Sequence, residues 1–269
     1  MQENKLGFQV SILASGSSGN VTYIETPKRK LLVDCGLSGK TVENLMTQIN
    51  RNLSEVDSIL VTHEHVDHIK GVGVLARKYH LDVYANEKTW QAMESKIGNL
   101  KPEQKHVFET GLTKTFGDID VMSYAVSHDA AKPQFYAFQK DGKQFAMLTD
   151  TGYVSEKLRG LLKNADAYLM ESNHDLELLR MGPYAWNLKQ RILGDKGHLS
   201  NEDSALALSE MVGNHTRRVY LGHLSKENNL KPLAKQTVDS ILAEKDCGLN
   251  QHFFLYDTDP DKPQELFWV

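Results

Sequence analysis

The segment ILVTHEHVDHIKG, residues 59–71, brings three histidines and an aspartate close together: His63, His65, Asp67 and His68. The first two lie two positions apart at the end of an apolar run that is typical of a strand, so both side chains can leave the same face. Imidazoles and carboxylates are poor strand and helix formers and gain nothing from burial, but they bind zinc, manganese or iron. The spacing therefore predicts a metal site.

Four further side chains of the same kinds stand at the ends of apolar runs elsewhere in the chain. They are Asp34 in KLLVDCG, His128 in YAVSHDA, Asp150 in FAMLTDTG and His223 in RVYLGHLS. Active-site residues collect on loops at the ends of strands. We therefore expect these residues to join the first cluster, and the crowding of donors indicates two ions rather than one.

The tetrapeptide GHLS occurs twice, at residues 197–200 and 222–225, in two different settings. The second copy follows an apolar run, which places His223 at a strand end. The first copy opens a helix, because Ser200 and Asp203 form a capping-box pattern. The free amides and positive dipole at a helix N-terminus favour an anion such as phosphate. We therefore interpret the copies as two sites with different tasks and not as a repeat.

Hydrophobic patterning predicts the elements that must position these residues. Strands are predicted at residues 8–13, 21–26, 30–35, 58–63, 120–127, 135–148 with a DG turn, 167–172, 218–223 and 252–257. Helices are predicted at residues 38–49, 70–80, 87–97, 155–165, 184–193, 201–212 and 230–245. The first half is rich in hairpins. This favours an α/β fold of two sheets with helices outside them over a doubly wound parallel sheet.

Composition limits the classes of protein that fit. A chain of 269 residues can bury a large core, and we expect one domain over residues 1–269. With 31 basic and 35 acidic side chains the net charge is -4, so any nucleic-acid binding must be local. Cys35 and Cys247 form no CxxC pair, which leaves His, Asp and Glu as metal ligands. Without a membrane-length apolar run or a signal-peptide pattern, we expect a cytoplasmic protein that does not contact membranes.

In chain order, the site residues resemble the signature of the metallo-β-lactamase fold superfamily over nearly the whole sequence. The resemblance implies a four-layer αββα sandwich with two divalent ions per chain (Zn²⁺ or Mn²⁺, with Fe as a further candidate). It divides the ligands into a first set (His63, His65, His128), a second set (Asp67, His68, His223) and a bridging carboxylate (Asp150). It implies that Asp34 orients ligands through hydrogen bonds without touching a metal.

The resemblance also implies catalytic roles. In phosphodiesterase branches of the superfamily, a histidine placed like His198 contacts the phosphate and protonates the leaving oxygen, while a residue placed like Asp67 serves both the metal and the reaction. The alternative for His198 is an imidazole that only caps a loop. Substrate contacts are expected from the ASGSSGN turn, from the MESNHD segment and from the first GHLS copy, namely Ser17, Ser18, Asn20, His174 and Ser200.

Differences between this sequence and other branches of the superfamily restrict the family to which it can belong. Antibiotic-hydrolysing members usually carry Cys where Asp150 stands, and oxygen-using members carry Glu where His65 stands. The segments SILASGSSGN, THEHVDHIKGVGVLARKY, MLTDTGYV and MESNHD, with the GHLS pair, closely resemble the bacterial WalJ/YycJ-type proteins. That family is associated with 5'-to-3' exonuclease action on double-stranded DNA.

The resemblance thus implies a DNA phosphodiesterase that uses a metal-bridged hydroxide, with DNA as its substrate and no obligate protein partner. The acidic net charge is compatible with this, because two divalent ions supply positive charge at the scissile phosphate. Two alternatives stay open. One is a small-molecule hydrolase of thioesters, lactones or cyclic phosphodiesters, which a small loop-walled pocket would favour. The other is a metal-binding protein without turnover.

Overall fold

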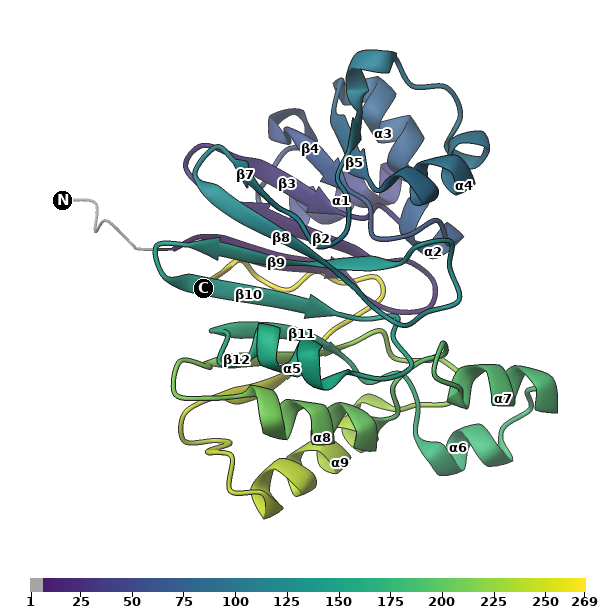
Figure 1. The fold of residues 1–269 in the computed structure, drawn as a ribbon, viewed down its shortest axis with the longest axis vertical. Coiled ribbons are helices and arrows are strands. Elements are labelled where there is room, and N and C mark those ends of the chain that lie inside the picture. Colours follow the sequence, from purple (N-terminus) through teal and green to yellow (C-terminus); the bar gives the residue numbers. More distant parts are fainter. Residues whose placement is uncertain (1–6) are drawn as a thin grey trace.

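Two seven-stranded sheets stack face to face in the computed structural model, which describes residues 7–269 (Figure 1). The start of the chain, where no signal-peptide pattern was found, lies mostly outside the described residues. The first sheet has the order β14 (Phe267–Trp268), β1 (Gln9–Ala14), β2 (Val21–Glu25), β3 (Lys30–Val33), β4 (Ser58–Leu60), β5 (Asp82–Ala85) and β6 (Lys105–Val107). The second has the order β13 (Phe254–Asp257), β12 (Arg218–Gly222), β11 (Ala167–Glu171), β10 (Lys143–Leu148), β9 (Gln134–Lys140), β8 (Ile119–Ala125) and β7 (Thr113–Phe116).

Each sheet is antiparallel in one half and parallel in the other. In the first sheet, β1, β2 and β3 pair antiparallel, whereas β3 to β6 are parallel. In the second, β7 to β10 are antiparallel and β10 to β13 are parallel. The carboxyl ends of parallel strands lie at one edge of a sheet, where ligands bind in many α/β proteins. Asp34, Asp150 and His223 follow strands with a parallel neighbour, whereas His128 follows the antiparallel β8.

Helices cover the outer faces of both sheets (Figure 1). The first sheet is covered by α1 (Gly39–Gln48), α3 (Val72–Tyr79) and α4 (Glu87–Ile97), and the second by α5 (Glu156–Leu162), α8 (Asn201–Met211) and α9 (Lys231–Glu244). A short helix, α2 (Val66–Ile69), follows β4, and α6 (Leu176–Met181) and α7 (Trp186–Leu193) project from the layers. Among residues 7–269, no helix has the length and apolar character that a membrane span requires.

Alternating side chains explain why both faces of the sheets are covered. Tyr23 and Leu32 point into the core under the helices of the first sheet, whereas Ile24, Leu31 and Val33 point into the core between the sheets. Successive strand residues face opposite sides, so a strand with two buried faces is apolar throughout. The four-layer αββα architecture predicted from the sequence is confirmed.

Several element predictions were wrong in detail. The strand predicted at 58–63 ends at Leu60, so His63 and His65 lie in the loop that leads into α2. The strands β5, β6, β7 and β14 and the helix α6 were missed. β7 is mostly exposed and β6 carries no buried residue, so neither has the apolar run that marks a strand. The DG turn is confirmed, since Asp141 and Gly142 both have positive φ, as a tight hairpin turn requires.

Candidate metal centre and active site

The predicted site residues meet where strands of both sheets end. Asp34 follows β3, Asp150 follows β10 and His223 follows β12, and their φ angles are 57°, 49° and 55°. Non-glycine residues rarely adopt this left-handed conformation, which clusters at functional sites. The backbone turns sharply after each strand. Through these turns, Asp150 and His223 of the second sheet face His68 and Asp67 of the first.

Three imidazoles form the first group of donors. The Nε2 atom of His63 lies 3.1 Å from Nδ1 of His65, and that atom lies 3.3 Å from Nε2 of His128. The Nδ1 atom of His128 donates to the carbonyl oxygen of Gly197 at 3.1 Å, which turns Nε2 toward the other two rings. Burial and the charge of His68 lower the pKa of His63 well below its ordinary value, so its ring is neutral and able to bind a metal.

The second group contains Asp67, His68 and His223. The Oδ2 atom of Asp67 lies 3.5 Å from Nε2 of His68 and 3.7 Å from Nε2 of His223. Asp150 lies between the groups: Oδ2 is 3.2 Å from Nε2 of His68, and Oδ1 is 3.4 Å from Nε2 of His223 and 3.8 Å from Nε2 of His128. A carboxylate in this place reaches both groups of donors.

Asp34 holds the second group from behind. Its Oδ2 atom accepts from Nδ1 of His68 at 2.7 Å, and its two oxygens accept from the backbone N–H and the hydroxyl of Thr62, each at 2.8 Å. These bonds fix the tautomer of His68 and leave its Nε2 atom facing Asp67 and Asp150. Asp34 itself belongs to none of the sets of converging donor atoms that the described residues form.

Glu171, which the sequence reasoning missed, is fully buried at the end of β11. One of its oxygens, Oε1, lies 2.7 Å from Nδ1 of His198 and 3.0 Å from Nδ1 of His223, while Oε2 accepts from the N–H of Thr151 at 2.9 Å. Burial opposes ionisation, but His198 and His223 outweigh it and lower the pKa of Glu171 to about 2. The signal available in the sequence was a charged residue closing the apolar run AYLM, as Asp150 and His223 close neighbouring strands.

The donor atoms fit divalent cations. The Oδ2 atom of Asp150 and the Nε2 atom of His223 are buried without a hydrogen-bond partner among the described residues, and both face the same space. Burial disfavours a charged His68 ring, but Asp150, Asp34 and Asp67 outweigh this effect and raise its pKa well above the ordinary value. The three carboxylates that raise this pKa bring negative charge to the centre, which cations neutralise. Four overlapping sets of converging donors meet there: His63, His65 and His128; His63, His68 and Asp150; Asp67, His68 and His223; and Asp150, Glu171, His198 and His223.

The predicted substrate contacts divide by accessibility. Ser17 and Ser18 are exposed on the loop after β1. Asn20 is buried, with its Nδ2 atom 3.2 Å from Nε2 of His68 and 3.4 Å from Oδ2 of Asp67, so it supports the donors directly. His174 and Ser200 are each 1% exposed, which removes both from the reach of a substrate.

Ser200 instead caps α8, as its place in the sequence predicted. Its hydroxyl accepts from the N–H of Asp203 at 3.0 Å and donates to the Asp203 carboxylate at 2.7 Å. In the usual capping box, the side chain at the third helical position accepts a hydrogen bond from the N–H of the cap residue. Here the Asp203 carboxylate accepts from the cap hydroxyl instead.

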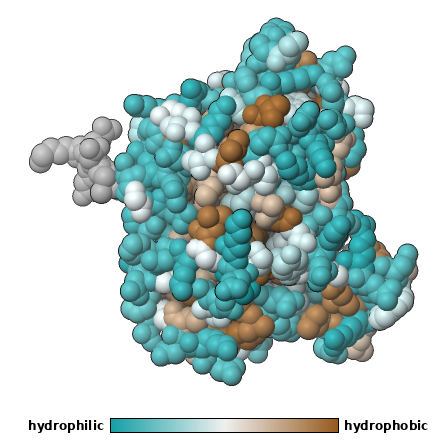
Figure 2. All heavy atoms as spheres, in the orientation of Figure 1, coloured by the Kyte–Doolittle hydropathy of each residue, from teal (hydrophilic) through white to brown (hydrophobic). Residues whose placement is uncertain are grey.

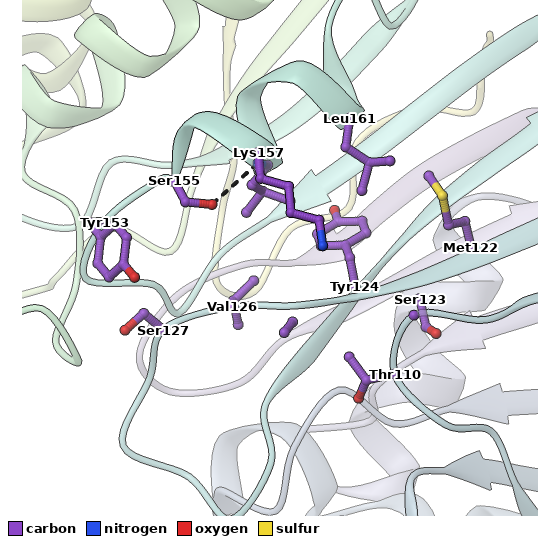
Figure 3. Close-up of a pocket in the computed structure, with 13 residues that line it drawn as sticks. Thr110, Met122, Ser123, Tyr124, Val126, Ser127, Tyr153, Ser155, Lys157 and Leu161 are labelled. Carbon is purple, nitrogen blue, oxygen red and sulfur yellow. Dashed lines mark hydrogen bonds between the residues drawn. The ribbon is translucent and has the colours of Figure 1, made fainter.

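A separate cavity lies beside α5 and offers no comparable chemistry (Figure 3). It has a volume of about 610 Å³ and is lined by β8, by Tyr153 and by α5, with Lys157 extending over it. None of its lining residues is His, Cys, Asp or Glu. The chemistry therefore belongs to the donor cluster and not to this larger cavity.

Comparisons with known proteins agree with this geometry. The family described as beta-lactamase superfamily domain matches residues 29–224. The chain is 61% identical to Exodeoxyribonuclease WalJ of Streptococcus pneumoniae over 98% of both chains, and 54% identical to Exodeoxyribonuclease YycJ of Bacillus anthracis over 98% of this chain and 100% of that protein.

Among solved structures, the fold is similar to that of the metallo-beta-lactamase fold protein YhfI from Bacillus subtilis, with a TM-score of 0.72 and 13% identity over 96% of this chain and 99% of that one. A diphosphatase of the PhnP family has a TM-score of 0.67 with 15% identity over 98% and 99% of the two chains. These structures support the fold alone, whereas the sequence relatives are close over their full length. The chain belongs to the metallo-β-lactamase superfamily and, within it, to the family of the exodeoxyribonucleases WalJ and YycJ.

Proposed function

We propose that this protein is a metal-dependent exodeoxyribonuclease that degrades double-stranded DNA from the 5' end. The observation that carries the proposal is the 61% identity to Exodeoxyribonuclease WalJ over 98% of the chain, in a protein whose donor atoms converge on one centre. These relatives do not favour a small-molecule hydrolase. A binding protein without turnover has no use for His198, which stands beside the donor cluster with one ring nitrogen held by a carboxylate.

The cluster is assigned to two divalent ions, Zn²⁺ or Mn²⁺. The first would be held by the three-imidazole group and the second by the group of Asp67, His68 and His223, with Asp150 shared between them. When bound, such ions lower the pKa of water and stabilise negative charge on the attacking and leaving oxygens of a phosphodiester. Glu171, bonded to Nδ1 of His223, fixes the orientation in which Nε2 faces Asp150.

The chain supplies the proton transfers through two residues of different exposure. The Asp67 side chain is 26% exposed, against 2% for Asp150, so Asp67 is the carboxylate that can accept a proton from the attacking water. The Nδ1–H group of His198 donates a hydrogen bond to Glu171, and when the ring carries a second proton, on Nε2, it transfers that proton to the leaving oxygen of the phosphodiester. The ionised Glu171 stabilises the protonated imidazole, as a carboxylate does in a catalytic triad.

The experiment combines metal analysis with labelled DNA. We expect about two ions per chain after reconstitution with Mn²⁺ or Zn²⁺, because two donor groups share one carboxylate. A 5'-labelled duplex should release labelled mononucleotide early, a 3'-labelled duplex should shorten gradually, and a closed circle should survive. Asp150→Ala should lose at least one ion and the activity, whereas the exposed control Asp261→Ala should keep both. Rapid hydrolysis of an ester or lactone with no action on any nucleic acid would contradict the proposal.

Both cysteines are free thiols, with Cys35 buried and Cys247 partly exposed. Free thiols are common in reducing compartments, whereas secreted proteins commonly carry disulfides. We therefore also propose that the protein acts in the cytoplasm, where chromosomal DNA is available to it in a bacterium. Oxidation of Cys247 in a secreted pool of the protein, detected by thiol labelling, would argue against this location.

A further inference from the structure

A second, smaller pocket lies between α7 and His198. This pocket has a volume of about 190 Å³, and His198 lines it together with Tyr184, Leu188 and Ile192 of the helical hairpin formed by α6 and α7. Figure 1 shows α6 and α7 projecting beside the edge where the strands end, and Figure 2 shows the surface indented above that projection. Because His198 lines it, the pocket adjoins the place where this ring would meet a substrate.

The hairpin contributes almost nothing to the hydrophobic core. The buried residue of α6 is Leu179, and the buried residue of α7 is Lys189, an ammonium and not an apolar side chain. Lys189 donates from Nζ to the carbonyl oxygens of Arg180 at 2.6 Å and Gly182 at 2.7 Å, which are among the unpaired carbonyls at the end of α6. These bonds fix α7 to the end of α6, so hydrogen bonds rather than apolar packing hold the hairpin together.

A second contact ties the far end of the hairpin to the donor cluster. Arg191 forms an ion pair with Asp129, the residue directly after His128. Asp129 also lies 3.5 Å from Nε2 of His128 through its Oδ1 atom. The hairpin and the cluster are therefore connected twice beside the pocket. One connection is the Arg191–Asp129 ion pair, and the other is the chain itself, which continues from the end of α7 to Gly197 and His198.

The two faces of α7 differ in what they meet. Leu188, Arg191 and Ile192 are spaced as neighbours on one helix face, and all three line the pocket. Trp186 and Leu193, seven residues apart, lie on the opposite face, where they are 65% and 41% exposed. The helix thus offers a matched pair of surfaces, one beside His198 and one turned away from it.

The walls of the pocket combine apolar and polar groups. Leu188, Ile192 and Tyr184 add apolar surface, the α7 face also carries Arg191, and Asn173 and Ser225 add polar groups. The side-chain amide nitrogen of Asn173 donates to the carbonyl oxygen of His223 at 2.9 Å. The side-chain oxygen of Asn173 accepts no hydrogen bond from the described residues. Apolar contact with a ring face and hydrogen bonds with a ring edge together recognise a nucleobase and its sugar.

We propose that this pocket binds the nucleoside part of the terminal nucleotide of the strand under attack, while its phosphodiester lies at the donor cluster. The inference rests on the proposed exonuclease function and adds its specificity determinant. A volume of about 190 Å³ is below the roughly 300–1,000 Å³ of pockets that enclose drug-sized ligands, and α7 forms one of its walls. A strand must therefore end in the pocket, which explains cleavage from an end and release of single nucleotides.

The test fills the pocket from α7 and uses the other face of the same helix as its control. Leu188→Trp should lower kcat/KM for duplex DNA about tenfold further than it lowers kcat/KM for bis(p-nitrophenyl) phosphate, because only DNA must place a nucleoside in the pocket. Leu193→Trp adds the same side chain to the exposed face and should match the unmodified protein on both substrates. A pocket role is excluded if both tryptophan variants lose the two activities in the same proportion.

A product-length assay separates the pocket from general damage to the hairpin. Leu188→Ala combined with Ile192→Ala enlarges the pocket and should add labelled dinucleotides to the products of a 5'-labelled duplex. An unchanged product length, with DNA still degraded, would overturn the pocket proposal alone. Absence of DNA degradation by the unmodified protein, with its metals bound, would instead overturn the proposed function, so the two failures are distinguishable.

Discussion

The two GHLS copies, 197–200 and 222–225, place their histidines on the same carboxylate oxygen. Nδ1 of His198 and Nδ1 of His223 lie 2.7 Å and 3.0 Å from Oε1 of Glu171. The rings differ in the nitrogen that remains. Nε2 of His223 faces Asp150 and Asp67 in a buried space, whereas the His198 side chain is 21% exposed and lines the pocket beside α7. One partner therefore serves two tasks, and the environment of the second nitrogen separates them.

Backbone context produces this difference. His223 adopts a left-handed conformation directly after β12, and its N–H donates to the hydroxyl of Ser15 at 2.8 Å. The N–H of His198 donates to the carbonyl of Ile192 at 3.0 Å, which places this copy against the end of α7. The same four residues thus point their imidazoles differently because one copy leaves a strand and the other follows a helix.

The glycines of the two copies are required for different close approaches. A Cβ atom on Gly197 would lie 2.0 Å from the carbonyl oxygen of Ile192, a backbone atom that cannot move independently of α7. A Cβ atom on Gly222 would lie 2.5 Å from a methyl group of Leu169 and 2.8 Å from the hydroxyl of Ser15. Gly197 therefore allows the hairpin to approach the site, whereas Gly222 allows two neighbouring strands and a loop to pack.

The largest expected effect separates the copies by metal content. His223→Ala removes a donor whose Nε2 atom faces the second ion's proposed position, so metal affinity should fall and DNA hydrolysis should drop by about 10⁴-fold or more. Elemental analysis and the labelled-duplex assay measure the two losses on one sample. A His223→Ala protein that binds two ions as tightly as the unmodified protein would remove His223 from the metal site.

The next effect belongs to the first copy. His198→Ala should keep a near-normal metal content and lower kcat by about 10²–10⁴-fold, the range for a lost general acid. A substrate with a better leaving group needs less protonation, so bis(p-nitrophenyl) phosphate should lose less activity than DNA in this variant. Loss of metal equal to that of His223→Ala would show that the two copies do the same work.

Glu171→Gln tests the partner that the copies share. The substitution keeps the volume and one acceptor oxygen but removes the charge that holds both Nδ1 protons, and a change at such a supporting residue costs about 10–100-fold in metal affinity or activity. We expect both quantities to fall, each by less than in the corresponding histidine variant. The same isosteric change at the exposed Glu210, Glu210→Gln, touches neither ring and serves as the control.

The smallest effect concerns His174, which precedes both copies in the chain and whose backbone pairs with that of Ser200. Neither of its ring nitrogens has a hydrogen-bond partner among the described residues. Burial lowers its pKa to about 4, so the unfolded chain binds its proton first as the pH falls. The free energy of unfolding should therefore decrease from about pH 6.5 down to about pH 4, by at most about 1.4 kcal/mol per pH unit from this residue. Urea denaturation of metal-free His174→Gln should show a shallower pH dependence, and an unchanged dependence would contradict the assignment.

Much of the metal site could be predicted because its signals are local. The HxHxDH run and the single donors after apolar strands identified seven converging side chains, and the helix signal at Ser200 correctly separated the first GHLS copy from the second. The exposed strands β6 and β7 could not be predicted in the same way, because their residues lack an apolar run. Pairing with β5 holds β6 in its sheet, and a tight hairpin with β8 holds β7.

The sequence by itself determined which residue types are available for metal chemistry and in which order strands and helices present them. Tertiary structure alone decided what Glu171 does, because its partners lie 27 and 52 positions away in the chain and no local pattern distinguishes it from the other glutamates. It also decided that His174 and Ser200 are buried and that α7 forms one wall of a pocket beside His198. Periodicity and capping act within a few residues, whereas burial, the sharing of one carboxylate by two histidines and the shape of a pocket arise only when distant segments pack.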